Sequence, residues 1–466
     1  MENIYVKDLI EKCNAKLIYG NPNEILENFS KDTRTIKNND IYIGIKGSNF
    51  NGNLFYEEAF NKGAKVCIIE ENSIKLDDLK KFDNKTLVIV DDSIETLRIL
   101  ASYKRSLYNI PIVGVTGSNG KTCTRDLIYS VVNKKYKTLK TDGNFNNNIG
   151  LPLTLLRLTD EKAAIIEMGM NALGEIDYLT KITKPNIGII TNVGTAHIGK
   201  LGSRENILKA KLEILNGIDK NGKLIINNDN DLLHNYYLKN KNDNVEIITV
   251  GIENDSDYTA TNIEMTGEKI NFDIVYKNKK YPIVLNIPNK VFIYNCLYAF
   301  AVGNILNIET DKIKSGIENF ELTKNRSEIF KIKNNITIIN DSYNASLDSM
   351  KSSLEMLANV NGKRKIAILG SMLELGEFSE SLHRKVGEEV YKNNIDILIT
   401  VGDDAKFIAL EAEKNGMNKE NIYSFSDNQT TINKLKEILK KEDAILLKAS
   451  NGLHFNQIVE KLKTDF

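Results

Sequence analysis

The segment Ile110–Arg125 constrains this chain more than any other part of it. The segment begins with an apolar run, Ile110–Val115, and leads into a helical pattern over Asp126–Asn133. A glycine loop between a strand and a helix is the context that a phosphate-binding loop requires. The loop between the apolar run and the helix reads Thr116-Gly117-Ser118-Asn119-Gly120-Lys121-Thr122.

The loop residues would have distinct roles in such a site. The glycines let backbone N–H groups surround phosphate oxygens at the positive end of the following helix. Lys121 is expected to reach the terminal phosphates of ATP, and the Thr122 hydroxyl is expected to hold Mg²⁺. The strict eight-residue pattern has glycine where this chain has Val115, so the shorter form T-G-x-x-G-K-T is present. A glycine turn that binds nothing is the alternative, and Gly-Lys-Thr in this context argues against it. The predicted nucleotide contacts are Gly117, Ser118, Asn119, Gly120, Lys121 and Thr122.

Length and charge limit the classes to which the chain can belong. Its 466 residues correspond to about three domains. Lys and Arg together number 62, as do Asp and Glu, and this zero net charge argues against a nucleic-acid binder. No apolar run approaches the roughly 20 residues that span a bilayer, and the charged, amphipathic segment Met1–Lys12 does not resemble a signal peptide. We therefore expect a cytoplasmic protein without membrane insertion.

The order of strands and helices predicts an α/β fold with three domains. Residues 1–108 form a small N-terminal unit, and residues 109–320 begin with strands separated by helices. That alternation favours a central parallel sheet with right-handed crossovers. Strand-like runs with short polar turns then predict an antiparallel meander beside the parallel sheet. These runs are Tyr258–Met265, Ile270–Tyr276 and Tyr281–Ile287.

Residues 321–466 alternate strands and helices in a doubly wound, Rossmann-like pattern. This part of the chain lacks a G-x-G-x-x-G sequence, so no dinucleotide is expected there. The predicted strands are Ile336–Asn340, Lys365–Leu369, Ile395–Val401, Asn421–Phe425 and Ala444–Leu447.

Two residues of the central domain are expected at the carboxyl ends of strands, where α/β sheets bind ligands. Glu167 closes the run Ala163–Ile166, and the Met-Gly-Met sequence after it is expected to bury the carboxylate. A carboxylate there can coordinate Mg²⁺ near the loop phosphates. His197 follows the strand Ile187–Asn192 and a glycine turn, where an imidazole can act as a metal ligand. A solvated glutamate and a structural histidine are the alternatives.

Lys211 occupies an unusual position for a charged side chain. Ser203 can cap a helix running to Leu215, and Lys209 on that helix is an ordinary solvated position. A buried lysine must be paired, neutral or chemically modified. A neutral amine can take up CO₂ to become a carbamate, which resembles a carboxylate as a metal ligand. A salt bridge to a distant acid is the alternative. The residues three and four positions from Lys211 are all apolar: Ile207, Leu208, Ile214 and Leu215.

Motifs with a recognisable pattern occur along the whole chain. They are Asp32–Arg34, Lys46–Phe50, Thr116–Thr122, Thr141–Gly150, Glu167–Asn171, Thr191–His197, Ala210–Ile214, Asp341–Ala345 and Met372–Glu377. Together these motifs resemble the Mur ligases of peptidoglycan synthesis. Within that family, the similarity is greatest to ligases that join D-alanyl-D-alanine to UDP-N-acetylmuramoyl-tripeptide.

The resemblance implies an ATP- and Mg²⁺-dependent amide ligase that acts as a cytoplasmic monomer through an acyl phosphate and releases ADP and phosphate. It implies catalytic roles for Lys121, His197 and Lys211, the last as a carbamate. The implied metal ligands are Thr122, Glu167, His197 and Lys211. The implied nucleotide contacts beyond the loop are Asn295, Arg326 and Asp341. The implied substrate contacts are Thr33, Arg34, Lys46, Asn49, Asn144, Asn147, Tyr343 and Asn344.

The chain departs from the family pattern in ways that bear on substrate details. Asn289-Lys290-Val291 stands where the family has Gly-x-His, and Asn344-Ala345-Ser346-Leu347 stands where it has Asn-Ala-Asn-Pro. Lys448-Ala449-Ser450-Asn451 stands where the family has Lys-Gly-Ser-Arg, and Asn51-Gly52 stands where it has Asp-Gly.

The sequence leaves two alternatives to this function. One alternative is a related Mur-type or folylpolyglutamate-synthase-like ligase with a different acceptor. The segment 32–50 argues against the folylpolyglutamate type, which lacks a uridine-nucleotide domain. A non-catalytic ATP-binding partner protein is the other alternative, and the intact phosphate and metal residues argue against it.

Overall fold

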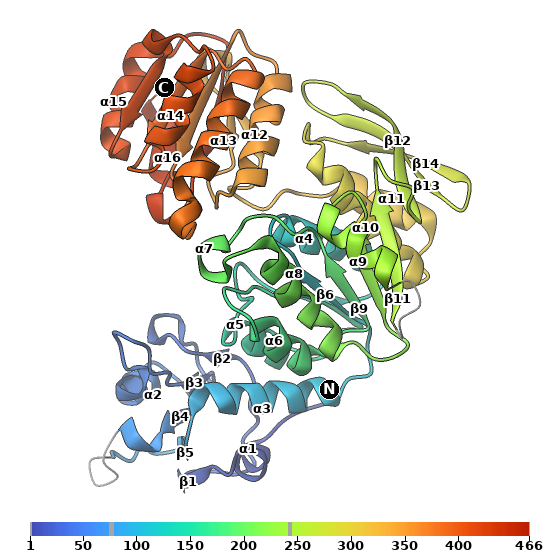
Figure 1. Cartoon of the computed structure of the whole chain (residues 1–466). Helices are drawn as coiled ribbons and strands as arrows, with labels where there is room; N and C mark the ends of the chain where they lie inside the picture. The colour runs from blue at the N-terminus through green and yellow to red at the C-terminus, as the bar shows by residue number, and fades with distance from the viewer. Residues whose placement is uncertain (1, 74–78, 241–244, 466) are drawn as a thin grey trace.

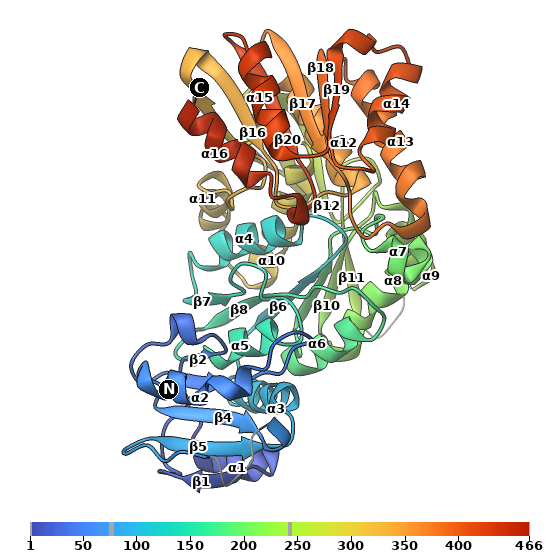
Figure 2. The ribbon, with the colours of Figure 1, turned by 90° about the vertical axis from the view of Figure 1, so that its left-hand side faces the viewer.

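The computed structural model describes residues 2–73, 79–240 and 245–465. They form three β-sheets in sequence order, each flanked by helices. Figure 1 shows three tiers, with the N-terminal sheet at one end and the C-terminal sheet at the other, and Figure 2 shows the same order after a quarter turn. The α/β fold class predicted from the sequence is confirmed. No helix within these residues is long and apolar enough to cross a membrane.

The N-terminal sheet has five strands, in the order β1 (Lys16–Tyr19), β5 (Thr86–Val90), β4 (Val66–Glu70), β3 (Ile41–Ile43) and β2 (Phe29–Ser30). Strand β1 is antiparallel to β5, and the other pairs are parallel. The helices are α1 (Val6–Cys13), α2 (Tyr56–Asn61) and α3 (Ser93–Ser106). Asp92 caps α3 by accepting hydrogen bonds from the backbone of Ile94 and Glu95. Helix α3 packs against α5 and α6 of the central tier, so apolar contacts join the two tiers.

The central sheet has nine strands, in the order β14 (Lys279–Leu285), β13 (Ile270–Tyr276), β12 (Tyr258–Met265), β11 (Glu246–Gly251), β10 (Lys223–Asn227), β9 (Ile187–Ile190), β6 (Ile112–Thr116), β8 (Ala163–Glu167) and β7 (Thr138–Lys140). The strands from β7 to β12 are parallel, and β12, β13 and β14 form the predicted antiparallel meander as a continuation of the same sheet. Strand β6 lies between β8 and β9, where the strand order reverses. Ligands of open α/β sheets bind outside the carboxyl ends of strands at such a reversal.

The helices of the central tier are α4 (Lys121–Val132), α5 (Gly150–Leu156), α6 (Glu175–Thr183), α7 (Ile198–Leu201), α8 (Arg204–Leu212), α9 (Asp231–Lys239), α10 (Val291–Ile305) and α11 (Thr310–Glu318). Helix α8 is shorter than predicted, because a 3₁₀ turn, Glu213–Gly217, replaces its expected last turn. Helix α10 is apolar nearly all round, which is typical of a helix buried within a protein. It packs against α4, the helix that follows the phosphate loop.

The C-terminal sheet has six strands, in the order β15 (Glu328–Ile332), β16 (Ile336–Asn340), β20 (Asp443–Lys448), β17 (Arg364–Gly370), β18 (Ile397–Val401) and β19 (Ile422–Phe425). All predicted strands of this sheet are present, and its parallel strands fit the doubly wound pattern. Edge strand β15, antiparallel to β16, was not predicted. The helices are α12 (Leu347–Asn359), α13 (Ser379–Lys392), α14 (Lys406–Lys414), α15 (Asn428–Ile438) and α16 (Asn456–Asp465).

Candidate active site

A cavity of about 410 Å³ lies between the carboxyl end of the central sheet and the C-terminal tier. The phosphate loop after β6, the end of β8 and the segment after β16 all reach it. Most of the predicted site residues of the central and C-terminal tiers line this cavity. They are Ser118, Asn119, Gly120, Lys121, Thr122, Asn144, Asn147, Glu167, His197, Asn295, Arg326, Asp341, Tyr343 and Asn344.

The phosphate loop has a shape that only glycine allows at Gly117. This residue has φ +152°, and a Cβ there would lie 1.8 Å from Oγ1 of Thr191. The Thr191 hydroxyl donates to the carbonyl of Asn119 at 2.6 Å, which fixes the threonine against the loop. Nζ of Lys121 donates to the carbonyl of Gly117 at 2.8 Å, so the lysine folds over the loop. This cradle at the N-terminus of α4 fits a phosphate group.

Glu167 is buried, as predicted, with 2% of its surface exposed. Its Oε2 accepts from Nη1 of Arg125 at 3.1 Å, and its Oε1 accepts from Nδ2 of Asn146 at 2.8 Å. Arg125 is also buried, pairs with Asp126, and donates to the carbonyl of Gly143 at 3.0 Å. The guanidinium therefore connects the carboxylate at the end of β8 to helix α4 and to the loop 141–150.

His197 contacts the C-terminal tier through its ring. Its backbone is left-handed, with φ +63°, and its Nδ1 lies 2.6 Å from Oε2 of Glu374. Burial lowers the pKa of His197 and the charge of Lys121 lowers it further, although Glu374 opposes both. The lowered pKa favours the neutral imidazole, which is the form that binds metals.

Lys211 is 1% exposed, whereas Lys209 on the same helix is exposed, as predicted. Burial lowers the pKa of Lys211 well below its ordinary value, and the positive charge of Lys121 lowers it further. Glu213 lies close in sequence but accepts from the backbone of Gly174 and Asp177 instead. Within the described part of the chain the Lys211 ammonium forms no hydrogen bond or ion pair. The lowered pKa favours the neutral amine, which is the form that carbamate formation requires.

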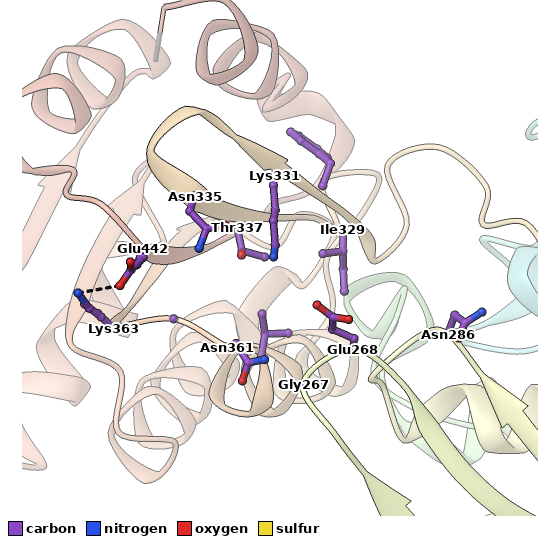
Figure 3. Close-up of a pocket in the computed structure, with 13 residues that line it drawn as sticks. Gly267, Glu268, Asn286, Ile329, Lys331, Asn335, Thr337, Asn361, Lys363 and Glu442 are labelled. Atoms are coloured by element: carbon purple, nitrogen blue, oxygen red, sulfur yellow. Dashed lines mark ion pairs between the residues drawn. The ribbon is translucent and has the colours of Figure 1, made fainter.

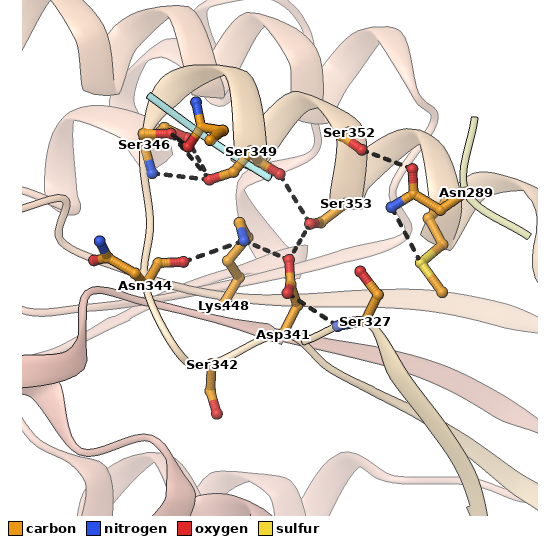
Figure 4. Close-up of polar contacts among 12 residues, drawn as sticks. Asn289, Ser327, Asp341, Ser342, Asn344, Ser346, Ser349, Ser352, Ser353 and Lys448 are labelled. Atoms are coloured by element: carbon orange, nitrogen blue, oxygen red, sulfur yellow. Dashed lines mark hydrogen bonds and ion pairs between the residues drawn. The ribbon is translucent and has the colours of Figure 1, made fainter. Parts of the chain in front are cut away.

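A polar network surrounds Asp341 on the C-terminal side of the cavity, and Figure 4 shows it. Oδ1 of Asp341 accepts from the backbone of Ser327 at 3.0 Å, and Oδ2 accepts from the hydroxyl of Ser353 at 2.6 Å. Nζ of buried Lys448 forms an ion pair with Asp341 and donates to the carbonyl of Asn344 at 3.2 Å. These contacts fix the segment that carries the predicted substrate residues.

Arg326 and Asn295 lie on different walls of the same cavity. The guanidinium of Arg326 stacks on the ring of Tyr343, with Cζ 3.9 Å from the ring centroid, and its Nε has no hydrogen-bond partner. Oδ1 of Asn295 accepts from the hydroxyl of Thr124 on α4 at 2.9 Å. Both positions are compatible with contacts to a bound nucleotide.

The phosphate loop also contacts the C-terminal tier directly. The hydroxyl of Ser346, at the start of α12, donates to Oδ1 of Asn119 at 2.7 Å. A second cavity, of about 450 Å³, separates the two tiers on the meander side. Figure 3 shows Glu268 and Asn361 on its walls, and it contains none of the predicted site residues. A polar contact thus joins the two tiers at the phosphate loop, and a cavity separates them on the meander side.

The predicted substrate contacts of the N-terminal tier lie outside the cavity. The Thr33 hydroxyl donates to Glu58 at 3.0 Å, and Arg34 forms an ion pair with Asp32 at 2.6 Å. Lys46 and Asn49 belong to an exposed turn in which Gly47 N donates to the carbonyl of Phe50 at 2.7 Å.

Without a modified lysine, the side chains at the cavity provide only some of the ligands that Mg²⁺ needs. No group of three or more His, Cys, Asp or Glu side chains that could hold a metal occurs in residues 2–73, 79–240 and 245–465. Glu167 and the Thr122 hydroxyl provide the oxygen ligands that Mg²⁺ prefers, and His197 provides a nitrogen. Lys211 is not among the residues that line the cavity, although its positive charge lowers the pKa of His197. A carbamate on Lys211 would add two oxygens with negative charge, and the residues present fit the ion if that carbamate reaches the cavity.

The sequence prediction missed several residues that shape the site. Arg125 has Ile128 and Tyr129 three and four positions after it, but Thr122 and Lys121 before it, so the pattern that identified Lys211 is only half present there. Asn146, Ser346, Glu374 and Lys448 act through contacts with distant parts of the chain, and their own sequence neighbourhoods give no such signal.

Comparison with known proteins identifies relatives of this chain. Residues 115–303 match the Mur ligase middle domain, and residues 325–451 match the Mur ligase, glutamate ligase domain. The UDP-N-acetylmuramoyl-tripeptide–D-alanyl-D-alanine ligase of Bacillus subtilis is 34% identical over 462 residues, which cover 98% of each chain. The crystal structure of MurF from Acinetobacter baumannii is 26% identical, with a TM-score of 0.88 over 99% of both chains. MurF from Thermotoga maritima in complex with ADP is also 26% identical, with a TM-score of 0.81 over 94% of this chain and 97% of that one. The chain therefore belongs to the Mur ligase family.

Proposed function

We propose that this chain is an ATP-dependent amide ligase of peptidoglycan precursor synthesis. It joins D-alanyl-D-alanine to UDP-N-acetylmuramoyl-tripeptide and releases ADP and phosphate. One observation carries the proposal: the phosphate loop, buried Glu167 and the C-terminal residues Asp341 and Tyr343 line a single cavity. The relative from Bacillus subtilis, which is named for this reaction, matches nearly the full length of both chains.

The reaction must first activate a carboxylate, which is a poor electrophile because it is negatively charged and has no good leaving group. A carboxylate oxygen of the tripeptide bonds to the γ-phosphorus of ATP while the bond to ADP breaks, which gives an acyl phosphate. The dipeptide amine then attacks the carbonyl carbon and loses a proton, and phosphate leaves as the amide forms.

The chain supplies positive charge and orientation for phosphoryl transfer. The phosphate loop and Lys121 line the cavity, where they would balance the negative charge of the terminal phosphates. Asn295, Arg326 and Asp341 are the proposed contacts to the rest of the nucleotide. Mg²⁺, when bound, would supply further charge neutralisation, with Thr122, Glu167, His197 and carbamoylated Lys211 as its ligands.

Acceptor binding is assigned to loops on either side of the cavity. Asn144 and Asn147 lie on the central side, and Tyr343 and Asn344 lie on the C-terminal side. The UDP portion is assigned to the N-terminal domain, with contacts from Thr33, Arg34, Lys46 and Asn49. Closure of the C-terminal domain over the cavity would exclude water, which otherwise hydrolyses an acyl phosphate.

The domain division 1–108, 109–320 and 321–466 belongs to the same proposal, and both boundaries fall between helices and strands. A monomer as the acting unit belongs to the same proposal. ATP and UDP-linked substrates are consistent with a reaction in the cytoplasm.

Phosphate release tests this function directly. The full chain is incubated with ATP, Mg²⁺, D-alanyl-D-alanine and UDP-muramoyl tripeptides that carry either lysine or diaminopimelate as the third residue. We expect phosphate release only when ATP, the dipeptide and a tripeptide are all present. Release with a folate and glutamate would support the folylpolyglutamate-synthase-like alternative, and no release with any pair would contradict ligase activity.

A further inference from the structure

His197 and Glu374 join the central and C-terminal tiers at the edge of the cavity. Nδ1 of His197 lies 2.6 Å from Oε2 of Glu374, although the two residues are 177 positions apart in the sequence. The backbone N–H of Gly199 also donates to the carbonyl of Glu374, at 3.2 Å. Figure 1 shows α7, the helix that begins after His197, directly beside the C-terminal tier. This contact therefore exists only when the two tiers are together.

The backbone holds Glu374 in an unusual conformation at this contact. Its φ is +64°, which is uncommon for a residue other than glycine. A Cβ on Gly199 would lie 2.7 Å from the carbonyl oxygen of Glu374 and 2.7 Å from the nitrogen of Gly376. The chain segments are thus in backbone contact, with no room for a side chain between them. A strained backbone of this kind persists only where its surroundings fix it, and it is common at functional sites.

The contact has a chemical consequence for the histidine. A neutral imidazole carries one N–H, and the partner of that N–H decides which ring nitrogen keeps its lone pair. A carboxylate at Nδ1 accepts a hydrogen bond and leaves the lone pair on Nε2. Metal-binding histidines commonly donate their other N–H to a carboxylate, which fixes the ring orientation and strengthens the ligand. Among the described residues Nε2 of His197 has no hydrogen-bond partner.

We propose that Glu374 is a positioning residue, which selects the Nδ1–H tautomer of His197 when the C-terminal domain closes. This inference rests on the proposed role of His197 as a metal ligand. Because Glu374 and His197 come from different domains, the full strength of the ligand is available only in the closed arrangement. Metal binding and closure then favour each other, since coupling between two equilibria is reciprocal.

The experiment measures Mn²⁺ binding, as a probe for Mg²⁺, to the full chain in the presence of ADP. Glu374→Ala should weaken Mn²⁺ binding about tenfold, as is typical when the partner of a metal-binding histidine is removed. Glu374→Gln should restore most of the affinity, because its amide oxygen can still accept from Nδ1–H. Glu377→Ala is the matched control, an exposed glutamate three residues away, and should bind as the wild type does.

NMR of ¹⁵N-labelled histidine provides a second measurement that does not depend on activity. The wild type should show His197 as the Nδ1–H tautomer, and Glu374→Ala should show a mixture of tautomers. An unchanged tautomer in Glu374→Ala, or a Gln variant as weak as the Ala variant, would overturn the inference.

His197→Ala separates this inference from the proposed function. If His197→Ala loses Mn²⁺ affinity and Glu374→Ala does not, the role of Glu374 is wrong while the metal role of His197 stands. If neither variant loses affinity, the metal role of His197 in the proposed function is wrong as well.

Discussion

Nη1 of Arg125 donates to Oε2 of Glu167 across 3.1 Å, and both side chains are 2% exposed. The network continues from Arg125 to Asp126, which also accepts from Lys140 at 2.9 Å and pairs with Thr323. Thr323 lies in the segment between α11 and β15, where the chain enters the C-terminal tier. A buried network thus connects the carboxylate at the cavity to the connection between the two tiers.

Arg125→Ala should destabilise the protein strongly. The substitution leaves two buried carboxylates without their guanidinium partner, which typically costs about 3–5 kcal/mol in the free energy of unfolding. Arg157→Ala is the control, because Arg157 pairs with Asp142 at the surface and such pairs contribute less than about 1 kcal/mol. Denaturant unfolding of the two variants measures the difference. Equal losses of stability would show that the Arg125 network has no special role.

Lys211→Ala should abolish ligation, whereas Lys209→Ala should have little effect. Lys211 is buried with a depressed pKa, so its neutral amine can form the carbamate that our account requires. Steady-state rates of the two variants, with and without added acetate, provide the measurement, and acetate should restore part of the activity of Lys211→Ala. Full activity in Lys211→Ala, or inactivity in Lys209→Ala, would refute the assignment.

Gly117→Ala should abolish nucleotide binding, because its Cβ would lie 1.8 Å from Oγ1 and 3.0 Å from Cβ of Thr191, so the loop would have to shift. Gly174→Ala controls for backbone strain alone. Gly174 has φ +86° with nothing within 4 Å of its Cβ position, so substitution there should cost about 1–2 kcal/mol of stability without a change in nucleotide affinity. Calorimetric titration with ADP compares the two. Wild-type ADP affinity in Gly117→Ala would contradict the phosphate-loop geometry.

Lys46→Ala should raise the KM for the UDP-tripeptide about tenfold while the KM for ATP stays unchanged. A hydrogen bond from a charged group contributes about 1.5–3 kcal/mol, and about 1.4 kcal/mol corresponds to a tenfold change. Lys37→Ala, a nearby exposed lysine, is the control. If both variants have the same KM for the UDP-tripeptide, the N-terminal turn at Lys46 does not bind the substrate.

Local patterns predicted much of the fold and part of the site. The phosphate loop, the meander over β12–β14 and the burial of Lys211 follow from spacing within a few turns of chain. Edge strand β15 was missed because its residues, Glu-Ile-Phe-Lys-Ile, mix polar and apolar types without the continuous apolar run of a buried strand. Edge strands take their hydrogen bonds from one neighbour, which the sequence of the strand itself does not reveal.

The rest of the site depends on contacts between distant segments. Ser346 and Asn119 are 227 positions apart, and Glu374 meets His197 across 177 positions. Whether such residues meet depends on how the C-terminal tier packs over the central sheet, which no local pattern determines. The ligand roles of all these residues remain predictions.

Transfer of oxygen from substrate to phosphate tests the central claim most directly. A UDP-tripeptide labelled with ¹⁸O in the reacting carboxylate is incubated with the full chain, ATP, Mg²⁺ and D-alanyl-D-alanine. If the carboxylate is activated as an acyl phosphate, one ¹⁸O should appear in the released phosphate for each amide formed, as measured by mass spectrometry. Amide formation that yields phosphate without ¹⁸O would contradict the account.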